Sequence, residues 1–467
     1  MIHLPFMENP AAVTFIASGR IVISRACRHA CAYCGFRSVE DVELLHLDKV
    51  KKALDTLQNA GAVEVVFSSG ESCYEFPDVQ IGLAKTGCNG FIEYIEKACT
   101  LALAHNLLPV LDIGRLSAIE LRQFSGLISA TVIETACLPF QGKGEPHEKA
   151  RGRDPHAARQ AIEEAHQAEV PYHLRLLCGI GETAEKRGSF INELARFCAV
   201  DPFLQDVHLQ VFQPSPGTPM RSRPPLPFEE VGKTMLALRE AFPVHFCSVS
   251  PHLFYRFPEL VAYGLNDLGS LPFAGGDPVF PSFPIPGIEE IKGRLLKENH
   301  FLGERLPLTT PAALRKTHLV TSLAAARVRL TERAASSITL IDDRHCFVCG
   351  MRNPGGLGLK FQFSEGPTCT TTWISSAKYQ GYAGIVHGGI LSTILDEVMA
   401  QALISSGNRV VTAEMKVFFR HPAPVGIPLV ITGKRTGGRR RLHLTSGEIR
   451  SHDGTLLAEA EGRYSAC

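Results

Sequence analysis

Three cysteines lie close together near the start of the chain, at Cys27, Cys31 and Cys34, directly after a short β-branched run. Thiolates at this spacing on one tight loop suit three irons of a four-iron four-sulfur (4Fe-4S) cluster, and the fourth iron is left without a protein ligand. A zinc site would need a fourth Cys or His, which a second paired motif usually supplies. His29 lies inside the loop, and no such partner follows. The spacing therefore predicts an iron–sulfur cluster with one iron open to chemistry.

A second group of polar residues follows the apolar run 63–67, which is typical of a buried parallel strand. The run leads into Ser69, Gly70 and Glu71, where a glycine permits close backbone approach and a carboxylate suits an ammonium group. With the cysteine spacing, this turn resembles the signature of the radical S-adenosylmethionine (SAM) superfamily. The resemblance implies that the open iron chelates SAM, that the turn holds its methionine end, and that Tyr33 packs near its adenine. It also implies cleavage of SAM to a 5′-deoxyadenosyl radical, with electrons from a donor such as flavodoxin or ferredoxin.

Strand-like and helical segments alternate through about residue 300. Residues 47–57 have helical spacing of apolar side chains, and residues 155–169 are rich in Ala, Glu and Gln. The alternation predicts a parallel sheet closed as a (β/α) TIM-type barrel, with its reactive groups at the carboxyl ends of the strands. Because the cysteine loop follows the first strand and the Ser-Gly-Glu turn follows the second, both fall on the same rim. The predicted strands are residues 21–23, 63–67, 107–111, 128–133, 172–177, 207–212 and 244–249.

Later motifs point to one subgroup of the radical SAM superfamily. Residues 179–183 and 208–220 follow the order found in the radical SAM subunit of deazaflavin synthase, in the clan that contains biotin synthase, and the similarity covers roughly residues 15–310. It places Glu134, at the end of the fourth strand, near the ribose of SAM. Arg175 stands where that subgroup has a small residue, and it either clamps a carboxylate of SAM or of the substrate or forms a salt bridge to a barrel acid. This departure leaves the substrate open.

The pattern of the sequence changes after an Ala- and Arg-rich stretch. We expect the barrel over residues 1–310, a helical linker over 311–340 and a second domain over 341–467. From His345 onward the chain resembles hotdog-fold acyl-CoA thioesterases of the phenylacetate-pathway type, which implies an α+β hotdog domain. Short alternating strands surround one helix. The predicted strands of this domain are residues 370–375, 410–419, 429–433, 442–450 and 456–464.

His387, Gly388 and Gly389 open the helix of this second domain. Unpaired backbone N–H groups and the positive end of the helix dipole could there polarise a thioester carbonyl. The resemblance implies that Asp396 acts as base or nucleophile and that Thr412 orients the attacking water. A hotdog domain that only binds an acyl group, or only forms a dimer, fits the same motif, since fold does not ensure function.

Cys346 and Cys349 form a C-x2-C pair beside His345. No second pair is visible in this part of the sequence, and a single pair is weak as a zinc signature. We therefore assign the pair no metal role from the sequence.

The composition limits the classes of partner. With 467 residues, of which 45% are hydrophobic, the chain is long enough for two cores. Lys and Arg (48) almost balance Asp and Glu (47), so no nucleic-acid partner is indicated. The N-terminus lacks the basic start and apolar core of a signal peptide, and no apolar run approaches the ~20 residues of a membrane helix. The sequence predicts a cytoplasmic protein without membrane attachment.

We therefore expect a bifunctional enzyme. Its radical SAM barrel modifies a small organic substrate, and its hotdog domain hydrolyses or binds an acyl or aroyl thioester and forms a homodimer. The alternative for the barrel is a biotin- or lipoyl-synthase-like insertion of sulfur into an acyl chain. Sulfur insertion would require a second cluster, for which the scattered cysteines offer no compact motif.

Overall fold

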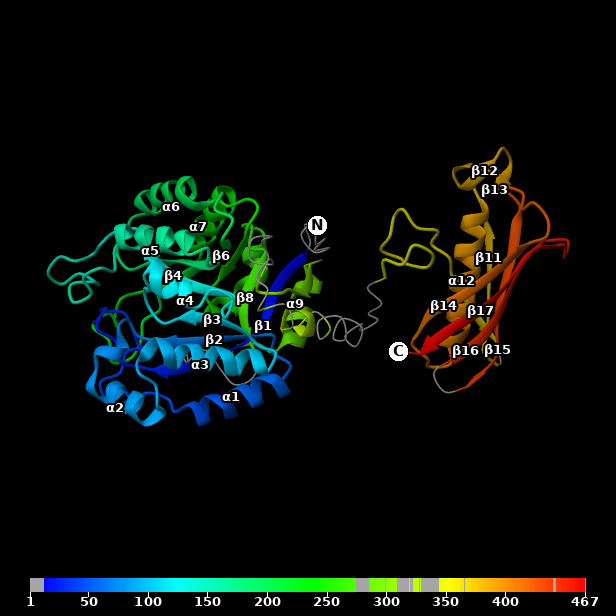
Figure 1. Cartoon of the computed structure of the whole chain (residues 1–467). Helices are drawn as coiled ribbons and strands as arrows, with labels where there is room; N and C mark the ends of the chain where they lie inside the picture. Colours follow the sequence, from blue (N-terminus) through cyan, green and yellow to red (C-terminus); the bar gives the residue numbers. More distant parts are fainter. Residues whose placement is uncertain are drawn as a thin grey trace. The chain divides into compact units, whose positions relative to one another are not determined.

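The computed structural model describes residues 12–273, 285–298, 300–308, 319, 322–326, 328, 344–364, 366–439 and 442–466. The chain divides into two compact units, Met1–Arg333 and Ala334–Cys467 (Figure 1). Each unit has its own hydrophobic core. Most of the predicted linker, residues 311–340, lies outside the described residues. Leu319, Leu323 and Ala326, which fall within it, are buried in the core of the first unit.

The first unit is a nearly closed barrel of parallel strands, as the sequence predicts (Figure 1). Neighbouring strands follow chain order from β1 to β7, and β8 returns to pair with β1, which also pairs with β9. Each predicted strand overlaps an observed one, whereas β8 and β9 have no predicted counterpart. The strands are β1 (Ala12–Ser24), β2 (Glu64–Ser69), β3 (Leu108–Asp112), β4 (Ala130–Ala136), β5 (Tyr172–Cys178), β6 (Leu204–Val211), β7 (Phe246–Val249), β8 (Asp267–Pro272) and β9 (Phe301–Glu304).

Helices cover the outer face of this barrel, so its strands are buried on both faces. In α1 the predicted helical spacing buries Val50, Leu54 and Leu57 on one side. A Cβ at Gly19 of β1 would lie 2.1 Å from the side chain of Leu57, so the missing side chain lets helix and strand pack closely. The helices are α1 (Leu47–Asn59), α2 (Pro77–Thr86), α3 (Phe91–Ala104), α4 (Ala118–Gln123), α5 (Pro155–Gln167), α6 (Ala184–Cys198), α7 (Phe228–Ala241), α8 (Phe257–Val261) and α9 (Ile288–Lys297).

The second unit packs one long helix, α12 (Gly388–Ile404), against a six-stranded antiparallel sheet of order β10-β11-β15-β16-β17-β14. The helix approaches the sheet at Gly433, where a Cβ would lie 2.5 Å from the carbonyl oxygen of Val398. The six strands are β10 (Gln362–Ser364), β11 (Thr368–Ile374), β14 (Val410–Phe419), β15 (Pro428–Arg439), β16 (Leu442–Ser451) and β17 (Leu456–Ala466). A small separate sheet is formed by β12 (Gln380–Tyr382) and β13 (Ile385–Val386).

Among the residues that the structure describes, no helix is both long enough and apolar enough to cross a bilayer.

Candidate functional sites

The three cysteines lie on the loop that follows β1, at the carboxyl ends of the barrel strands. Cys27 is buried, Cys31 and Cys34 are half-buried, and all three line a cavity of about 540 Å³. Other loops fix the backbone of this loop. The hydrogen bonds are Arg28 N–H to Glu71 O (2.9 Å), Ala30 N–H to Lys149 O (3.0 Å), Ala32 N–H to Pro146 O (2.9 Å) and Met220 N–H to Ala32 O (3.1 Å).

Gly70 sets the distance between the cysteine loop and the end of β2. A Cβ at this position would lie 2.2 Å from the carbonyl oxygen of Ala26 and 2.3 Å from the Cβ of Cys27. The loop therefore rests directly on the backbone of Gly70. The predicted Ser-Gly-Glu turn and the predicted cluster loop are in contact.

The environment of the thiols suits a cationic ligand. Burial raises the pKa of Cys27 and raises that of Cys31 to about 12. Free thiolates are disfavoured there, and positively charged iron would compensate their charge. His29 is 5% exposed, and its Nε2 has no hydrogen-bond partner among the described residues. The donor set and this unpaired polar atom both fit an iron–sulfur cluster at the loop.

Two of the residues predicted to bind SAM contact other parts of the rim. The hydroxyl of Tyr33 lies 3.1 Å from Nε2 of His147, whose ring meets the tyrosine ring edge to face. The carboxylate of Glu71 accepts the backbone N–H of Arg115 at 3.3 Å. Both side chains line a second cavity of about 70 Å³, which Ser69 and Glu134 also line.

Glu134 and Arg175 belong to a network of charges inside the barrel. Arg175 donates to Asp112 (3.0 Å) and lies 3.7 Å from Glu134, whose other carboxylate oxygen accepts from Arg153 at 2.5 Å. Arg20 also donates to Asp112, at 2.7 Å. Burial would raise the pKa of Asp112, but the guanidinium groups of Arg175 and Arg20 outweigh burial and hold it below its usual range. The salt-bridge alternative for Arg175 is thus present, while its side chain also lines the large cavity.

The sequence analysis did not single out Arg20, Asp112 or Arg153. Arg20 and Asp112 stand in or at the end of apolar strands. Each is a single charged residue in or next to a strand that is otherwise apolar and buried on both faces. Such a residue indicates a polar interior, because a buried charge needs polar partners. Arg153 lies in a loop and carries no such signal.

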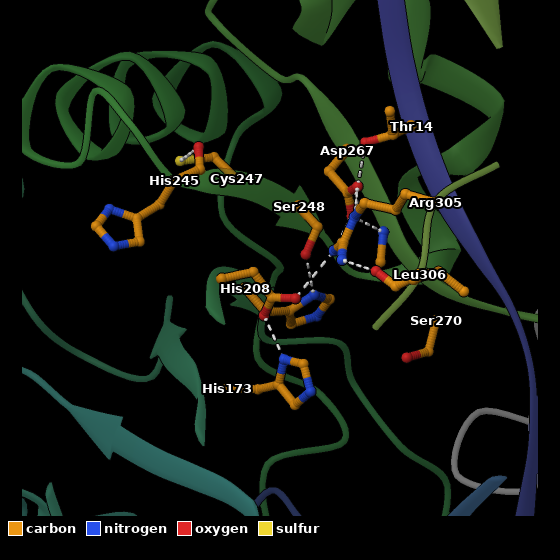
Figure 2. A network of polar contacts seen from close by, with 12 residues as sticks. Thr14, His173, His208, His245, Cys247, Ser248, Asp267, Ser270, Arg305 and Leu306 are labelled. Atoms are coloured by element: carbon orange, nitrogen blue, oxygen red, sulfur yellow. Dashed lines mark hydrogen bonds and ion pairs between the residues drawn. The ribbon is translucent and has the colours of Figure 1, made fainter. Parts of the chain in front are cut away.

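Polar residues of β5, β6 and β8, together with Arg305, which follows β9, form a buried network of contacts in the barrel (Figure 2). Arg305, 3% exposed, contacts Asp267 through Nε (2.6 Å) and Asp206 through a terminal nitrogen (3.0 Å). His173 Nδ1 lies 2.9 Å from Asp206. Two residues after Asp206 on β6, His208 Nδ1 lies 2.9 Å from the hydroxyl of Ser248. We call Arg305, Asp206, Asp267 and His173 the barrel floor.

In the second unit, the structure brings Asp396 and Thr412 together. The Thr412 hydroxyl donates to Asp396 Oδ1 at 2.8 Å. The hydroxyl of Tyr464, which the sequence analysis did not single out, donates to the same oxygen at 2.8 Å. From Ala458 to Tyr464, buried residues of β17 alternate with exposed or half-buried ones, so the sequence pattern is typical of a core position for Tyr464.

His387 forms the N-cap of α12, and its Nδ1 accepts the N–H of Gly389 at 2.9 Å. A Cβ at Gly388 would lie 3.3 Å from the ring of Phe419. Asp396 follows Gly388 by eight residues in the same helix, which places it about 12 Å further along the axis. The start of α12 and Asp396 of one copy therefore do not form one site.

Comparisons with known proteins give two groups of relatives. The chain is 31% identical over 291 residues to the 7,8-didemethyl-8-hydroxy-5-deazariboflavin synthase of Methanothermobacter thermautotrophicus, covering 62% of this chain and 89% of the relative. It is 30% identical over 304 residues to the synthase of the same name from Archaeoglobus fulgidus, covering 63% and 90%.

The model of the thioesterase superfamily matches residues 383–458, which contain α12 and most of the large sheet. Among solved structures, a thioesterase superfamily protein is 24% identical (32% of this chain, 80% of that chain, TM-score 0.26). The E. coli PaaI protein of the phenylacetic acid degradation operon is 21% identical (24% and 80%, TM-score 0.23). Over residues 383–458, the second unit is therefore similar to the thioesterase superfamily. Through its first unit, the chain belongs to the family of the 7,8-didemethyl-8-hydroxy-5-deazariboflavin synthases, which are radical SAM enzymes.

Proposed function

We propose that the first unit binds a 4Fe-4S cluster through Cys27, Cys31 and Cys34 and uses SAM to modify a small organic substrate, in a deazaflavin-synthase-like reaction. The observation that supports this most directly is the contact between the cysteine loop and Gly70. When bound, the reduced cluster and SAM supply a 5′-deoxyadenosyl radical, which removes a hydrogen atom from the substrate. An external one-electron donor such as flavodoxin or ferredoxin is required.

The rim residues have separate roles in this proposal. Glu71 holds the amino group of SAM, since a carboxylate that accepts one backbone N–H retains further lone pairs. Gly70 and Ser69 provide the wall beside it, and Tyr33 lies near the adenine. Glu134 holds the ribose.

Arg175 and Arg20 line the large cavity, and both donate a hydrogen bond to the carboxylate of Asp112. A substrate carboxylate or carbonyl that entered this cavity would find guanidinium donors already fixed in position. Gln210 and Ser248 line the same cavity and add neutral hydrogen-bonding groups. The substrate of this proposal is therefore polar, with several hydrogen-bond acceptors.

Iron analysis tests the proposal against sulfur insertion. We expect about four irons and four sulfides per chain after anaerobic reconstitution, whereas a second cluster would give about eight. Cys31→Ala should lose most of this iron and the formation of 5′-deoxyadenosine on reduction. The matched control is Cys88→Ser, a half-buried thiol outside the loop. SAM cleavage by Cys31→Ala at the parent rate would contradict the proposal.

We infer that the second unit hydrolyses an acyl or aroyl thioester with Asp396 as base or nucleophile. Thr412 and Tyr464 both donate to one oxygen of Asp396, which fixes the carboxylate and leaves its other oxygen for water or substrate. Because the start of α12 lies about 12 Å along the axis from Asp396 of the same copy, the site would be completed by a second copy.

Asp396→Asn tests this inference in the full-length protein. The amide keeps the shape but removes the negative charge, so turnover across a panel of acyl- and aroyl-CoA esters should fall at least about 100-fold. Glu448→Gln, an exposed carboxylate on β16, is the control. If the parent binds CoA esters but turns none of them over, the second unit is a binding module.

A further inference from the structure

Three side chains with metal-binding atoms converge at the start of the second unit. Cys346 Sγ lies 3.5 Å from Glu397 Oε2, and Cys349 Sγ lies 3.2 Å from Glu397 Oε1. One ligand atom from each of these residues lies within 4.8 Å of the other two. They are the only such group of Cys, His, Asp or Glu among the residues that the structure describes.

The turn that carries the two cysteines is shaped around the first sulfur. The N–H of Val348 donates to Cys346 Sγ at 3.4 Å, and the N–H of Gly350 donates to the Cys346 carbonyl at 2.9 Å. A Cβ at Gly350 would lie 2.4 Å from the nitrogen and 2.5 Å from the oxygen of Cys346, so only glycine fits. A backbone N–H directed at sulfur stabilises a thiolate, as a metal ligand requires.

The third group comes from a different element. Glu397 lies on α12, where Gln401, one turn later, donates to Glu397 Oε1 at 2.8 Å. Among the described residues, the carboxylate accepts hydrogen bonds from this amide and the two thiols alone. The carboxylate of Glu397 is half-buried, and its partners, two thiols and an amide, carry no positive charge. A bound cation would neutralise it.

We propose that Cys346, Cys349 and Glu397 bind one Zn²⁺ ion. Two sulfur ligands and one carboxylate suit the borderline-soft zinc ion and not the hard ions Ca²⁺ and Mg²⁺. Binding releases one proton from each thiol. The fourth tetrahedral position is taken by water or by the Gln401 amide oxygen, after rotation of the amide group.

The ion would fasten the first segment of the second unit to its central helix. Residues 344–359 contain no helix or strand. Their described links include the hydrogen bonds Leu357 N–H to Phe347 O (2.7 Å) and Leu359 N–H to Val348 O (2.8 Å). Val348 and Leu359 belong to the core of this unit. A metal ion bound by both cysteines and by Glu397 would keep Val348 and Leu359 packed in that core. This structural role is independent of the proposed hydrolysis.

The test uses the full-length chain with Cys27, Cys31 and Cys34 all replaced by Ala, because the cluster loop could itself retain zinc. After loading with zinc and desalting, elemental analysis of this background should give about one zinc per chain. Adding Cys349→Ser should lower the zinc content at least about tenfold. The added control Cys88→Ser, a half-buried thiol of the first unit, should leave it unchanged.

Cobalt gives a readout on the same background that needs no further substitution. Co²⁺ added to the background should produce thiolate-to-cobalt charge-transfer absorption and the visible bands of tetrahedral cobalt, and zinc should displace both. A background that binds neither metal, or an equal zinc content after Cys346→Ser and Cys349→Ser together, would overturn the proposal. A Cys346–Cys349 disulfide in the freshly purified protein, found by mass spectrometry, would also overturn it.

Discussion

At Gly70 the absence of a side chain determines how close two functional segments lie. The carbonyl of Ala26 and the Cβ of Cys27 occupy the space that a larger residue would need. Such a contact joins residues far apart in the sequence, so spacing alone could not predict it. From the Ser-Gly-Glu motif, the sequence did predict that the glycine at this turn permits close approach of the backbone.

Gly70→Ala should therefore impair cluster binding while leaving all three thiols in place. Overpacking of this kind costs about 1–3 kcal/mol, and we expect it to displace the cysteine loop and lower the iron content below about half of the parent value. The measurement is iron per chain after anaerobic reconstitution. Gly188→Ala on α6 is the control, because nothing lies within 4 Å of its Cβ position. A full complement of iron in Gly70→Ala would show that the loop does not depend on this contact.

Residue types at strand ends could be predicted from the sequence, but their partners could not. Glu134 and Arg175 do lie in neighbouring strands and face one another across 3.7 Å. Their stronger partners, Arg153 and Asp112, come from a loop and from another strand. Ion pairs between distant segments depend on tertiary geometry, which no local pattern records.

At the scale of elements, the polar interior of the barrel explains which strands the sequence analysis missed or shortened. β1 begins at Ala12 in the structure, whereas the sequence predicts residues 21–23. Its earlier residues include Thr14 and Ser18, which donate to Asp267 and Glu64 inside the barrel. Strand patterns assume an apolar interior face, so a strand with inward polar side chains looks like a loop.

β8 was missed for the same reason. Its sequence, Asp-Leu-Gly-Ser-Leu-Pro, lacks β-branched residues and contains a glycine and a proline. The segment becomes a strand because Asp267 accepts from Arg305 and Thr14 and because its backbone pairs with β1. The strands of the second unit were easier to predict, since β16 and β17 alternate buried and more exposed residues over much of their length.

Arg305→Met tests how far the barrel floor stabilises the first unit. Removing one member of a buried ionic group leaves Asp206 and Asp267 without their guanidinium, which costs about 3–5 kcal/mol. Chemical denaturation should show this loss in the transition of the first unit, with the transition of the second unit unchanged. Arg294→Met on α9, which removes an exposed pair with Glu290, should cost about 1 kcal/mol or less. Equal effects of the two substitutions would contradict the role of the floor.

The pH dependence of the same transition has a defined sign. Burial would raise the pKa of Asp206, but His173 and Arg305 outweigh burial and hold it below its usual value. Asp206 therefore contributes stability above its ordinary pKa, and this contribution is lost as the pH falls. Burial would lower the pKa of His173, but Asp206 raises it overall, so its contribution is present at low pH and is lost as the pH rises through the raised pKa.

At the scale of the whole molecule, each of the two units carries its own candidate site, and the second unit has an exposed edge strand that a second copy could cover. β14 pairs with β17 and has no second neighbour among the described residues. Seven of its ten residues are exposed, without the alternation seen in β16. A long, partly apolar edge strand in a monomer would be an aggregation site. A two-fold interface along β14 would cover it and bring the start of one α12 towards Asp396 of the partner.

Phe418→Glu provides the test of this assembly in the full-length chain. Phe418 is 42% exposed on β14, and a two-fold interface along this strand would bury the new carboxylate of each copy, so we expect a monomer by light scattering. If the proposed thioester site needs both copies, hydrolysis should be lost with the dimer, whereas SAM cleavage by the barrel should continue at the parent rate. Ile374→Glu, at a 59% exposed position on β11, should change neither property. Thioester turnover by a monomeric Phe418→Glu protein would show that one copy contains the whole site, and a dimer that persists would place the interface on another face.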